Sequence, residues 1–374
     1  MRRIAQVISI EGTRRGGAAN VMLELLAGGR ERGWSQIVLN PFASTPEALA
    51  SDCEGIPYET LTPHRATALP RARRWLRERL RDFQPDVVQV HLTHAAVTMA
   101  SLRRSDSFPT VLTHHHHDHL LTQGRPWSAR LDRVAGRRFD RVVACSRAVE
   151  RFLLTEYKYP PSKVVCIPNG WSGSPLPGPS RPAAPTVVCV ANFRRQKRHD
   201  LLLDAFARVR ETMPDARLLL LGDGPLRAEA QQRARRLGLG HSVEFTGSVD
   251  VWPRLAESDV FALATRYEGL PVAALEAMAA GLPVVASDVE GMSEVVRPGV
   301  TGYLVPPDDR EALAERLTML LSDRELRDRM GRAAREAAQE STMDRCVTRY
   351  FELYEELVSE RRSGGVQAAR IPAW

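Results

Sequence analysis

Cysteine is scarce in this sequence, and the cysteines form no recognisable motif. The chain of 374 residues has five cysteines, and none of them belongs to a CxxC pair. An odd number cannot be fully paired within one chain, and three of the five lie beside apolar runs that are typical of strands. We therefore expect reduced, mostly buried thiols, as in cytosolic proteins.

Long apolar runs and aromatic residues are also few. No segment reaches the roughly 18 to 20 apolar residues that span a bilayer. The apolar run in the N-terminal MRRIAQVISIEG is shorter than that of a secretion signal and leads directly into a predicted strand. We therefore expect a cytoplasmic protein. Aromatics make up 6% of the chain, which is few for a protein that stacks nucleic-acid bases.

Basic residues outnumber acidic residues only in the first half of the chain. Through Ser172 there are 25 Lys and Arg against 16 Asp and Glu, and beyond it 27 against 29. The surplus indicates an anionic partner for the first half: an acidic acceptor, a membrane surface or nucleic acid. A predicted amphipathic helix from Leu69 to Phe83 carries part of it. Its apolar stripe can pack on a sheet, or the helix can contact anionic lipid headgroups.

Strand-like apolar runs alternate with helical runs in both halves. Predicted strands cover residues 3–9, 35–40, 86–91, 110–113, 141–145 and 164–167, then 186–190, 217–221 and 259–263. This alternation is typical of doubly wound parallel sheets. Residues 171–185, WSGSPLPGPSRPAAP, have no such period and are expected to link two domains. The cleft between the domains is the expected ligand site.

The most informative stretch is residues 265–287, TRYEGLPVAALEAMAAGLPVVAS. It predicts a helix that begins at Pro271, ends near Ala280 and is followed by a buried strand. Unpaired N–H groups at a helix start, together with the helix dipole, can bind a phosphate. The groups in question belong to Leu270, Val272 and Ala273.

Two carboxylates flank this helix start. Glu268 precedes the helix, and Glu276 follows eight positions later on its second turn, so that both can reach one ligand. Carboxylates accept hydrogen bonds from vicinal hydroxyls, as sugars offer them. The spacing alone would equally suit a dipole-capping Glu268 and a solvated Glu276.

The surrounding motif, E-G-L-P-x-x-x-L-E-A-M-A-x-G-x-P-V-V-A-S, resembles the donor-site signature of glycosyltransferase family 4, a retaining group with the GT-B fold. The resemblance implies that Glu276 binds the nucleotide ribose and that Glu268 binds hydroxyls of the donor sugar. It also implies that intervening amides contact the sugar and diphosphate. These amides are those of Gly269, Leu270 and Val272, since Pro271 has no N–H to offer.

A second anion site is expected where the strand at 186–190 meets the next helix. The family usually reads G-R-x-x-x-x-K here, and the Arg and Lys clamp the diphosphate. Lys197 matches the Lys, but Asn192 stands at the Arg position. The resemblance therefore leaves Arg194 and Arg195 as candidates for the second cation. A solvated charge cluster is the alternative.

Two motifs in the first half also resemble the family. Gly16 and Gly17 resemble its N-terminal G-G loop, which lies near the donor phosphate and the acceptor. The pattern P-x-V-x-T-x-H, beginning at Pro109, selects His115 as the residue near the anomeric carbon, with His116 as the runner-up. The five histidines around Asp118 also suggest a metal site. Consecutive side chains leaving a strand diverge, however, which disfavours a shared ion.

The resemblance implies an α/β protein with the GT-B fold: two doubly wound, Rossmann-like parallel-sheet domains with an interdomain cleft. The implied parts are an acceptor-side domain at 1–172, a linker at 173–185, a nucleotide-sugar domain at 186–341, a helix at 342–361 that returns to the first domain, and a tail at 362–374.

The implied activity is transfer of a sugar, with retention and without a metal, from a nucleotide diphosphate-sugar to a hydroxyl of a glycan, glycolipid or small molecule. His115, Lys197, Arg195 and Glu268 are the catalytic candidates. We expect no nucleic acid as partner, an anionic or lipid-linked acceptor, and peripheral contact with the inner face of the membrane. A nucleotide-sugar epimerase and a basic nucleic-acid-binding protein are the alternatives, but no acid/base pair for an epimerase is evident.

Overall fold

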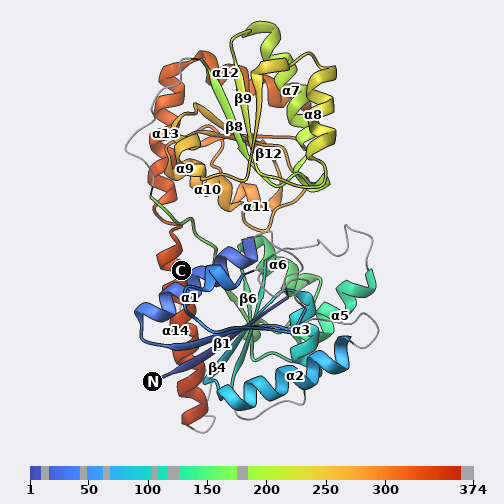
Figure 1. Ribbon diagram of the computed structural model, residues 1–374. Helices are drawn as coiled ribbons and strands as arrows, with labels where there is room; N and C mark the ends of the chain where they lie inside the picture. The colour runs from blue at the N-terminus through green and yellow to red at the C-terminus, as the bar shows by residue number, and fades with distance from the viewer. Residues whose placement is uncertain are drawn as a thin grey trace. The chain divides into compact units, whose positions relative to one another are not determined.

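The computed structural model describes residues 1–9, 17–42, 49–61, 68–102, 108–115, 126–174 and 184–363. The chain divides into two compact units, one formed by Met1–Pro168 with the chain from Asp344 and the other by Asn169–Met343. Each unit is built on one parallel sheet covered by helices (Figure 1). The prediction of two doubly wound parallel sheets is therefore confirmed.

The first unit has a seven-stranded sheet in the order β3-β2-β1-β4-β5-β6-β7. Its strands are β1 (Arg3–Ile8), β2 (Ser35–Asn40), β3 (Tyr58–Thr60), β4 (Val87–His91), β5 (Thr110–His114), β6 (Arg141–Ala144) and β7 (Val164–Cys166). Its helices include α1 (Gly17–Glu31), α2 (Ala68–Phe83), α3 (Thr93–Ser101), α5 (Pro126–Gly136), α6 (Arg147–Thr155) and α14 (Met343–Arg362). The strand order reverses between β1 and β4, where doubly wound sheets bind ligands.

The central strands of this sheet are buried on both faces, but the two faces differ in polarity. In β4, Val88 and Val90 belong to an apolar cluster with residues of α2 and α3. Gln89 and His91 alternate with them and point to the other face. There the hydroxyl of Tyr354, on α14, donates to Gln89 Oε1 at 2.9 Å, and Tyr350 OH lies 2.9 Å from Thr113 Oγ1. These buried hydrogen bonds tie α14 to the sheet.

The amphipathic helix α2 uses its apolar stripe for ordinary packing. Leu76 and Leu80 are buried in the cluster under the sheet. On the outer face, Arg74 pairs with Glu78 at 3.0 Å, while other arginines such as Arg71 stay exposed. Because Leu76 and Leu80 are covered and Leu69 is the one large apolar residue of α2 exposed in the described structure, α2 can offer a lipid surface mainly its charge.

The second unit has a six-stranded sheet in the order β10-β9-β8-β11-β12-β13. Its strands are β8 (Thr186–Val190), β9 (Arg217–Leu221), β10 (Val243–Gly247), β11 (Val260–Leu263), β12 (Val284–Ser287) and β13 (Gly302–Val305). Its helices include α7 (His199–Thr212), α8 (Arg227–Arg236), α9 (Val251–Ala256), α10 (Val272–Ala279), α11 (Glu290–Ser293), α12 (Arg310–Ser322) and α13 (Arg324–Ala338). The strand order reverses between β8 and β11, and both strands lead into the predicted site.

The helix α10 begins one residue later than predicted, because Pro271 is its cap residue and Val272 its first helical residue. Its C-terminal end is held by α13. Arg335 donates from Nη2 to the carbonyl of Ala280 at 3.0 Å, which satisfies one of the carbonyls that a helix end leaves unpaired. Gly281 follows with φ of 85°, as predicted for a glycine that ends a helix.

Among residues 169–174, Trp171 belongs to the core of the second unit. Its indole nitrogen donates to the carbonyl of Ala338 at 2.8 Å, and its backbone N–H donates to Ser341 at 3.0 Å. Most of the segment 173–185 lies outside the described residues.

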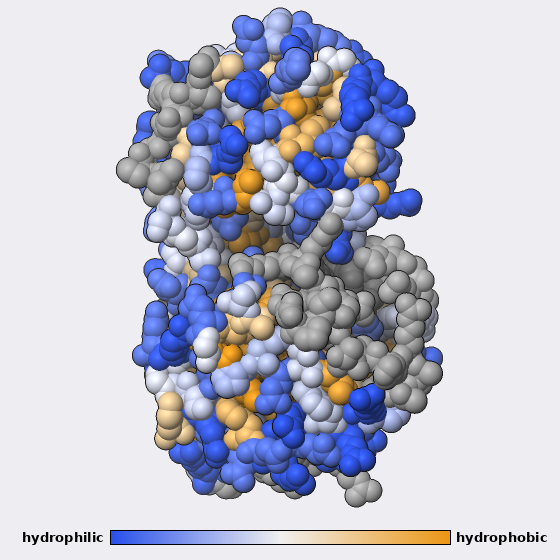
Figure 2. Space-filling model, in the orientation of Figure 1, coloured by the Kyte–Doolittle hydropathy of each residue, from blue (hydrophilic) through white to orange (hydrophobic). Residues whose placement is uncertain are grey.

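The surface in view in Figure 2 is mainly hydrophilic, with hydrophobic side chains in small separate patches. In the described part of the chain, no helix combines the length and the apolar character needed to cross a bilayer.

Candidate functional site

The loops that follow β8 and β11 bring two predicted site residues together. Lys197 donates from Nζ to Glu268 Oε1 at 2.6 Å, and the hydroxyl of Thr265 donates to the same oxygen at 2.8 Å. Glu268 is only 5% exposed. A carboxylate at this depth requires such partners to stay charged. The pair is neutral overall and holds the Lys197 ammonium group, with its remaining N–H donors, beside the loop that leads into α10.

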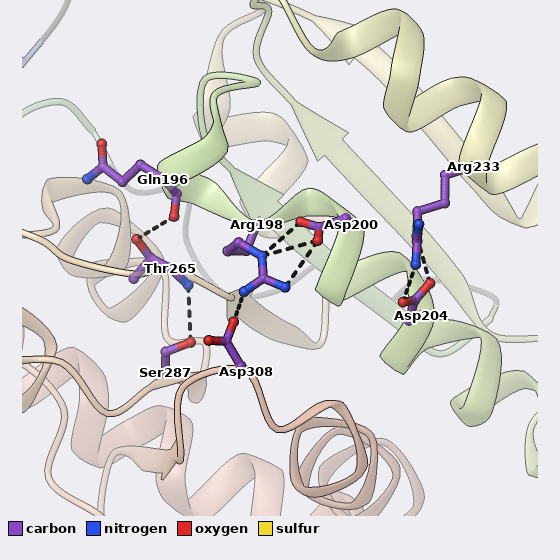
Figure 3. A network of polar contacts seen from close by, with 8 residues as sticks. All are labelled: Gln196, Arg198, Asp200, Asp204, Arg233, Thr265, Ser287 and Asp308. Carbon is purple, nitrogen blue, oxygen red and sulfur yellow. Dashed lines mark hydrogen bonds and ion pairs between the residues drawn. The ribbon is translucent and has the colours of Figure 1, made fainter. Parts of the chain in front are cut away.

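Further hydrogen bonds join the same two loops. The side-chain amide of Gln196 donates to the backbone carbonyl of Tyr267 at 2.6 Å. The backbone carbonyl of Gln196 accepts from the N–H of Arg266 at 3.0 Å. In Figure 3, Thr265 lies between the carbonyl of Gln196 and the hydroxyl of Ser287, which accepts from the Thr265 N–H at 3.1 Å. The sequence analysis missed these roles, although Thr265 opens the stretch that it singled out.

The turn G-D-G-P, residues 222–225 after β9, packs against the cationic loop, by which we mean residues 192–198 after β8. The N–H of Phe193 donates to the carbonyl of Asp223 at 3.1 Å. A Cβ on Gly224 would lie 2.5 Å from the Phe193 carbonyl oxygen, and one on Gly222 would collide with the carbonyl of Ala191. Glycine at both positions thus lets two backbone segments approach closely.

The cations of the loop differ in whether they are neutralised. Arg198 lies between Asp200, which accepts from its Nε at 3.0 Å, and Asp308 (Figure 3). Arg194 and Arg195 are exposed and form no ion pair with any residue that the structure describes. Both candidates for the second clamp cation are therefore available to an anion, and Arg198 is not.

A buried histidine next to this loop contributes no charge. His199 stacks on Phe193, with ring centroids 4.0 Å apart. Burial, followed by the nearby charge of Lys197, lowers the pKa of His199 to about 4. His199 is therefore neutral at physiological pH, and the positive charge of the loop comes from its arginines and Lys197.

The backbone N–H groups that are free to bind an anion at the start of α10 differ from those predicted. Val272, expected to bind the donor, already donates its N–H to the carbonyl of Leu270 at 3.0 Å. Within the described residues, the N–H groups of Gly269, Leu270 and Ala273 have no hydrogen-bond partner. Donation by Val272 would require the turn at Pro271 to open.

Glu276 is half-buried and lacks a partner. Its side chain makes no hydrogen bond or ion pair with any other residue of the described ranges. Burial alone raises its pKa to about 7. A desolvated carboxylate without a partner is unfavourable by itself, and such groups are enriched at functional sites. It can accept hydrogen bonds from two neighbouring hydroxyls of a ligand.

Gly291, on α11, packs directly against the backbone of Glu268 and Gly269, where a side chain would not fit. A Cβ at this position would lie 2.5 Å from the carbonyl oxygen of Glu268 and 2.8 Å from that of Gly269. The sequence analysis assigned it no role, because nothing in its own segment shows which backbone packs against it.

In the first unit, His115 follows β5 and joins a chain of buried polar groups. His91 lies between Gln6 and His115: its Nε2 is 3.1 Å from Gln6 Oε1, and its Nδ1 is 3.1 Å from His115 Nε2. Burial lowers the pKa of His91 to about 3, so His91 is neutral and has a single ring proton.

When Gln6 presents its carbonyl oxygen to His91, as in the 3.1 Å contact with Oε1, the single proton of His91 lies on Nε2. Its Nδ1 must then accept a hydrogen bond from His115 Nε2. A neutral His115 thus has its proton on Nε2 and its lone pair on Nδ1. The sequence analysis did not assign Gln6 or His91, because they lie in different strands, which the fold brings to one face.

The two histidines of the run that the structure describes diverge, as the strand geometry predicts. His114 points to Asp132 on α5, with Nδ1 3.5 Å from Oδ2, whereas His115 points to His91. His116 and the rest of the run lie outside the described residues, as does Gly16. Of the other candidates, Gly17 opens α1 and is exposed, and Asn192 is exposed in the cationic loop.

Comparisons with known families cover most of the chain. The family described as Glycosyltransferase Family 4 matches residues 15–171, and Glycosyl transferases group 1 matches residues 178–337. The two matches meet near the boundary between the two units.

Individual proteins resemble the chain over different lengths. Phosphatidyl-myo-inositol mannosyltransferase of Mycobacterium leprae is 31% identical, covering 91% of this chain and 93% of that protein. N-acetyl-alpha-D-glucosaminyl L-malate synthase of Bacillus anthracis is 35% identical over 48% of each, so the chain spans about half the length of that relative. The structure of Anabaena Alr3699/HepE in complex with UDP and glucose superposes with a TM-score of 0.80 at 20% identity, covering 94% of this chain and 99% of that one. These findings confirm the predicted GT-B fold.

Proposed function

The chain belongs to glycosyltransferase family 4, and from this premise we propose that it transfers a sugar from a nucleotide diphosphate-sugar to a hydroxyl of a glycan or glycolipid, with retention at the anomeric carbon. The observation that carries the proposal is the Lys197–Glu268 pair beside unpaired amides at the start of α10. Together these groups form a preorganised seat for a diphosphate.

The difficult step is departure of the nucleoside diphosphate while positive charge builds on the sugar. Lys197, with Arg194 or Arg195, stabilises the negative charge that develops on the leaving group, and the amides of Gly269 and Leu270 add two donors. Such groups are effective because they are already oriented before the reaction begins. Glu268 keeps Lys197 in place and uses its second oxygen for a hydroxyl of the donor sugar.

Glu276 accepts hydrogen bonds from the two hydroxyls of the nucleotide ribose. This role accounts for a half-buried carboxylate that pairs with no cation of the described residues, since the ligand supplies the missing donors. In the first unit, His115 accepts a hydrogen bond at Nδ1 from a hydroxyl of the donor sugar or the acceptor. Gln6 and His91 hold it in the required tautomer.

The acceptor is lipid-linked or anionic. Phosphatidyl-myo-inositol mannosyltransferase of Mycobacterium leprae, which the chain matches over 93% of that protein, acts by its name on phosphatidyl-myo-inositol, and the first half of this chain has the whole surplus of positive charge. The protein works in the cytoplasm, in peripheral contact with the inner face of the membrane. Residues 1–172 form the acceptor side, and residues 186–341 bind the donor.

Transfer does not require a divalent metal, because cationic side chains and amides supply the charge stabilisation that a metal would otherwise provide. Unchanged turnover in EDTA is the expected result. Loss of turnover in EDTA that added magnesium or manganese restores would contradict metal independence and leave the donor site unaffected.

A panel of nucleotide sugars tests the function itself. Each sugar is incubated with the full chain and followed for slow hydrolysis, and lipid and soluble acceptors are then added. We expect one donor to be consumed, faster with acceptor, and the product to keep the anomeric configuration of the donor. Failure of every donor to bind or react would reject the proposal.

A further inference from the structure

The helix α5 has its bulky apolar side chains on the side that faces solvent. Trp127 is 66% exposed, Leu131 47% and Val134 52%. Their spacing is i, i+4 and i+7, so the three side chains form one stripe along the helix. In a helix of a globular protein, a stripe of this kind normally faces the core. We call these three residues the outer stripe of α5.

The opposite side of α5 already has its own partners in the first unit. Ala129 and Ala135 are buried there, and the buried Asp132 accepts a hydrogen bond from the hydroxyl of Tyr157 at 3.2 Å. Gly136 passes so close to Tyr159 that a Cβ would collide with the phenol. The helix is therefore fixed to its sheet through small residues and Asp132, and the outer stripe takes no part in that packing.

The surface around the outer stripe is cationic. Arg130 is exposed on the helix, and Arg137 and Arg138 are exposed just after it. Asp132 is the only acidic residue among residues 126–138 and is buried. Near Tyr157 and Tyr159, the two tyrosines that contact α5, Lys158 and Glu156 are both exposed and add no net charge, so the cations of this surface are those of residues 126–138. An anionic surface would therefore meet no exposed carboxylate in this segment.

We propose that α5 is a membrane-docking helix, which inserts its outer stripe into the interface of an anionic phospholipid bilayer while the flanking cations bind headgroups. Tryptophan favours the interfacial region, and arginine can lay its stem along apolar surface while its charge stays among headgroups. Three side chains are too few for a stable protein interface, which buries at least about 1,000 Å². They suffice for reversible binding to a membrane.

This inference deepens the proposed use of a lipid-linked acceptor, and it assigns the docking role to α5 instead of α2. The two helices differ in what they present. In α2 the apolar stripe is buried and the exposed face is mainly charged, whereas α5 exposes both apolar and cationic groups. An amphipathic face that combines the two binds anionic lipid more strongly than charge alone.

Sedimentation with vesicles tests the proposal on the full chain. One set of vesicles is pure phosphatidylcholine and the other an equal mixture with phosphatidylglycerol. The test variant combines Trp127→Ser, Leu131→Ser and Val134→Ser. The matched control combines Leu69→Ser, Arg71→Ser and Arg77→Ser on α2, where all three residues are also exposed. Both variants should keep the thermal midpoint of the wild type, because the changed side chains lie on the surface.

We expect the wild type to bind the anionic vesicles, the α5 variant to bind at least about tenfold more weakly and the α2 variant to stay within about threefold of wild type. Equal binding by the α5 variant, a larger loss in the α2 variant or no preference for anionic lipid would each overturn the proposal. Self-association of the wild type without lipid, abolished in the α5 variant, would identify the outer stripe as a protein interface and would also overturn it.

Donor hydrolysis in lipid-free buffer separates this inference from the proposed function. The α5 variant should hydrolyse the nucleotide sugar at the wild-type rate, because no changed residue contacts the donor site. If no nucleotide sugar reacts but the vesicle result holds, the proposed function fails and the docking helix stands. If hydrolysis holds and the α5 variant binds vesicles normally, only the docking helix fails.

Discussion

The two sheets present opposite chemistry at the same topological place, the carboxyl ends of the strands around the point where strand order reverses. In the first unit this edge has a neutral chain of hydrogen bonds through Gln6, His91 and His115. In the second it has the charged Lys197–Glu268 pair and exposed arginines. The fold selects the location, and the loops select the chemistry. One edge suits hydroxyl groups, and the other suits a diphosphate.

Net charge does not reveal which half holds the anion site. The first half has the entire positive surplus, yet the buried His91 at its strand edge is neutral. The second half has slightly more acids than bases, yet two of its arginines and several amides remain unpaired in the described loops. What matters is whether a local charge is already neutralised. Arg198, held by Asp200 and Asp308, shows how a cation can be present and still unavailable.

The largest expected effect concerns the donor edge. Glu276→Ala should abolish binding of the nucleotide sugar without lowering the thermal midpoint, since the side chain has no partner within the described residues. Isothermal titration and thermal unfolding measure the two quantities. Glu315→Ala, on α12, is the control. Preserved donor affinity in Glu276→Ala would reject the ribose site.

Lys197→Ala should reduce turnover by about a hundredfold to a thousandfold, as loss of a preorganised donor to a developing charge does. Donor affinity should fall much less, because the charge to be stabilised is greatest in the transition state. Steady-state kinetics together with direct binding separate the two. Arg208→Ala, whose exposed side chain pairs with Glu211, is the matched loss of a cation. Equal losses in turnover and affinity would reduce Lys197 to a binding contact.

On the neutral edge, His91→Phe should lower turnover by about tenfold and change its pH profile, because His115 loses the acceptor that fixes its tautomer. His94→Phe provides the control, since His94 follows the same strand but is exposed. An unchanged pH profile in His91→Phe, with a lower thermal midpoint, would make His91 a purely structural residue.

The pH dependence of stability should reveal Glu276 without any ligand. Its folded pKa, about 7, lies above the unfolded value of 4.5, so folding favours its protonated form. The penalty for burying the charge is absent below pH 4.5, grows between 4.5 and 7 and is complete above 7. Glu276→Gln should therefore be more stable than wild type by about 3 kcal/mol at pH 8 but by less than about 1 kcal/mol at pH 5. Denaturant unfolding at both values checks this, and a constant difference would contradict the shift.

The smallest expected effect is indirect. Gly291→Ala should weaken donor binding by about threefold to tenfold, because its methyl group would push on the backbone of Glu268 and Gly269. Ser293→Ala on the same helix is the control, since Ser293 is exposed. Donor affinity equal to wild type in Gly291→Ala would mean that the loop can yield without consequence.

The bounds of strands could be predicted from the sequence where burial requires a run of apolar residues. Strands such as Thr186–Val190 and Arg217–Leu221 have the predicted bounds, because strands buried on both faces are mainly apolar. Sequence reasoning failed on α5, which it did not predict. There the bulky apolar residues face outward and small residues face the sheet, so the usual relation between apolar spacing and core is inverted.

The same limit applies to the site. The motif around Glu268 and the position of Lys197 indicated a shared ligand, and the structure places the two side chains 2.6 Å apart. The partners that hold them could not be inferred, because Gln196, Thr265 and Gly291 act through contacts between loops that are far apart in sequence. His91 was missed for the same reason.

A crystal structure of the full chain soaked with sugar nucleotides of UDP, GDP and ADP tests the central claim most directly. The account predicts that one of them places its diphosphate against Lys197 and the amides of Gly269 and Leu270, and its ribose hydroxyls against Glu276. A ligand bound elsewhere, or soaked crystals in which side chains fill this place, would contradict it.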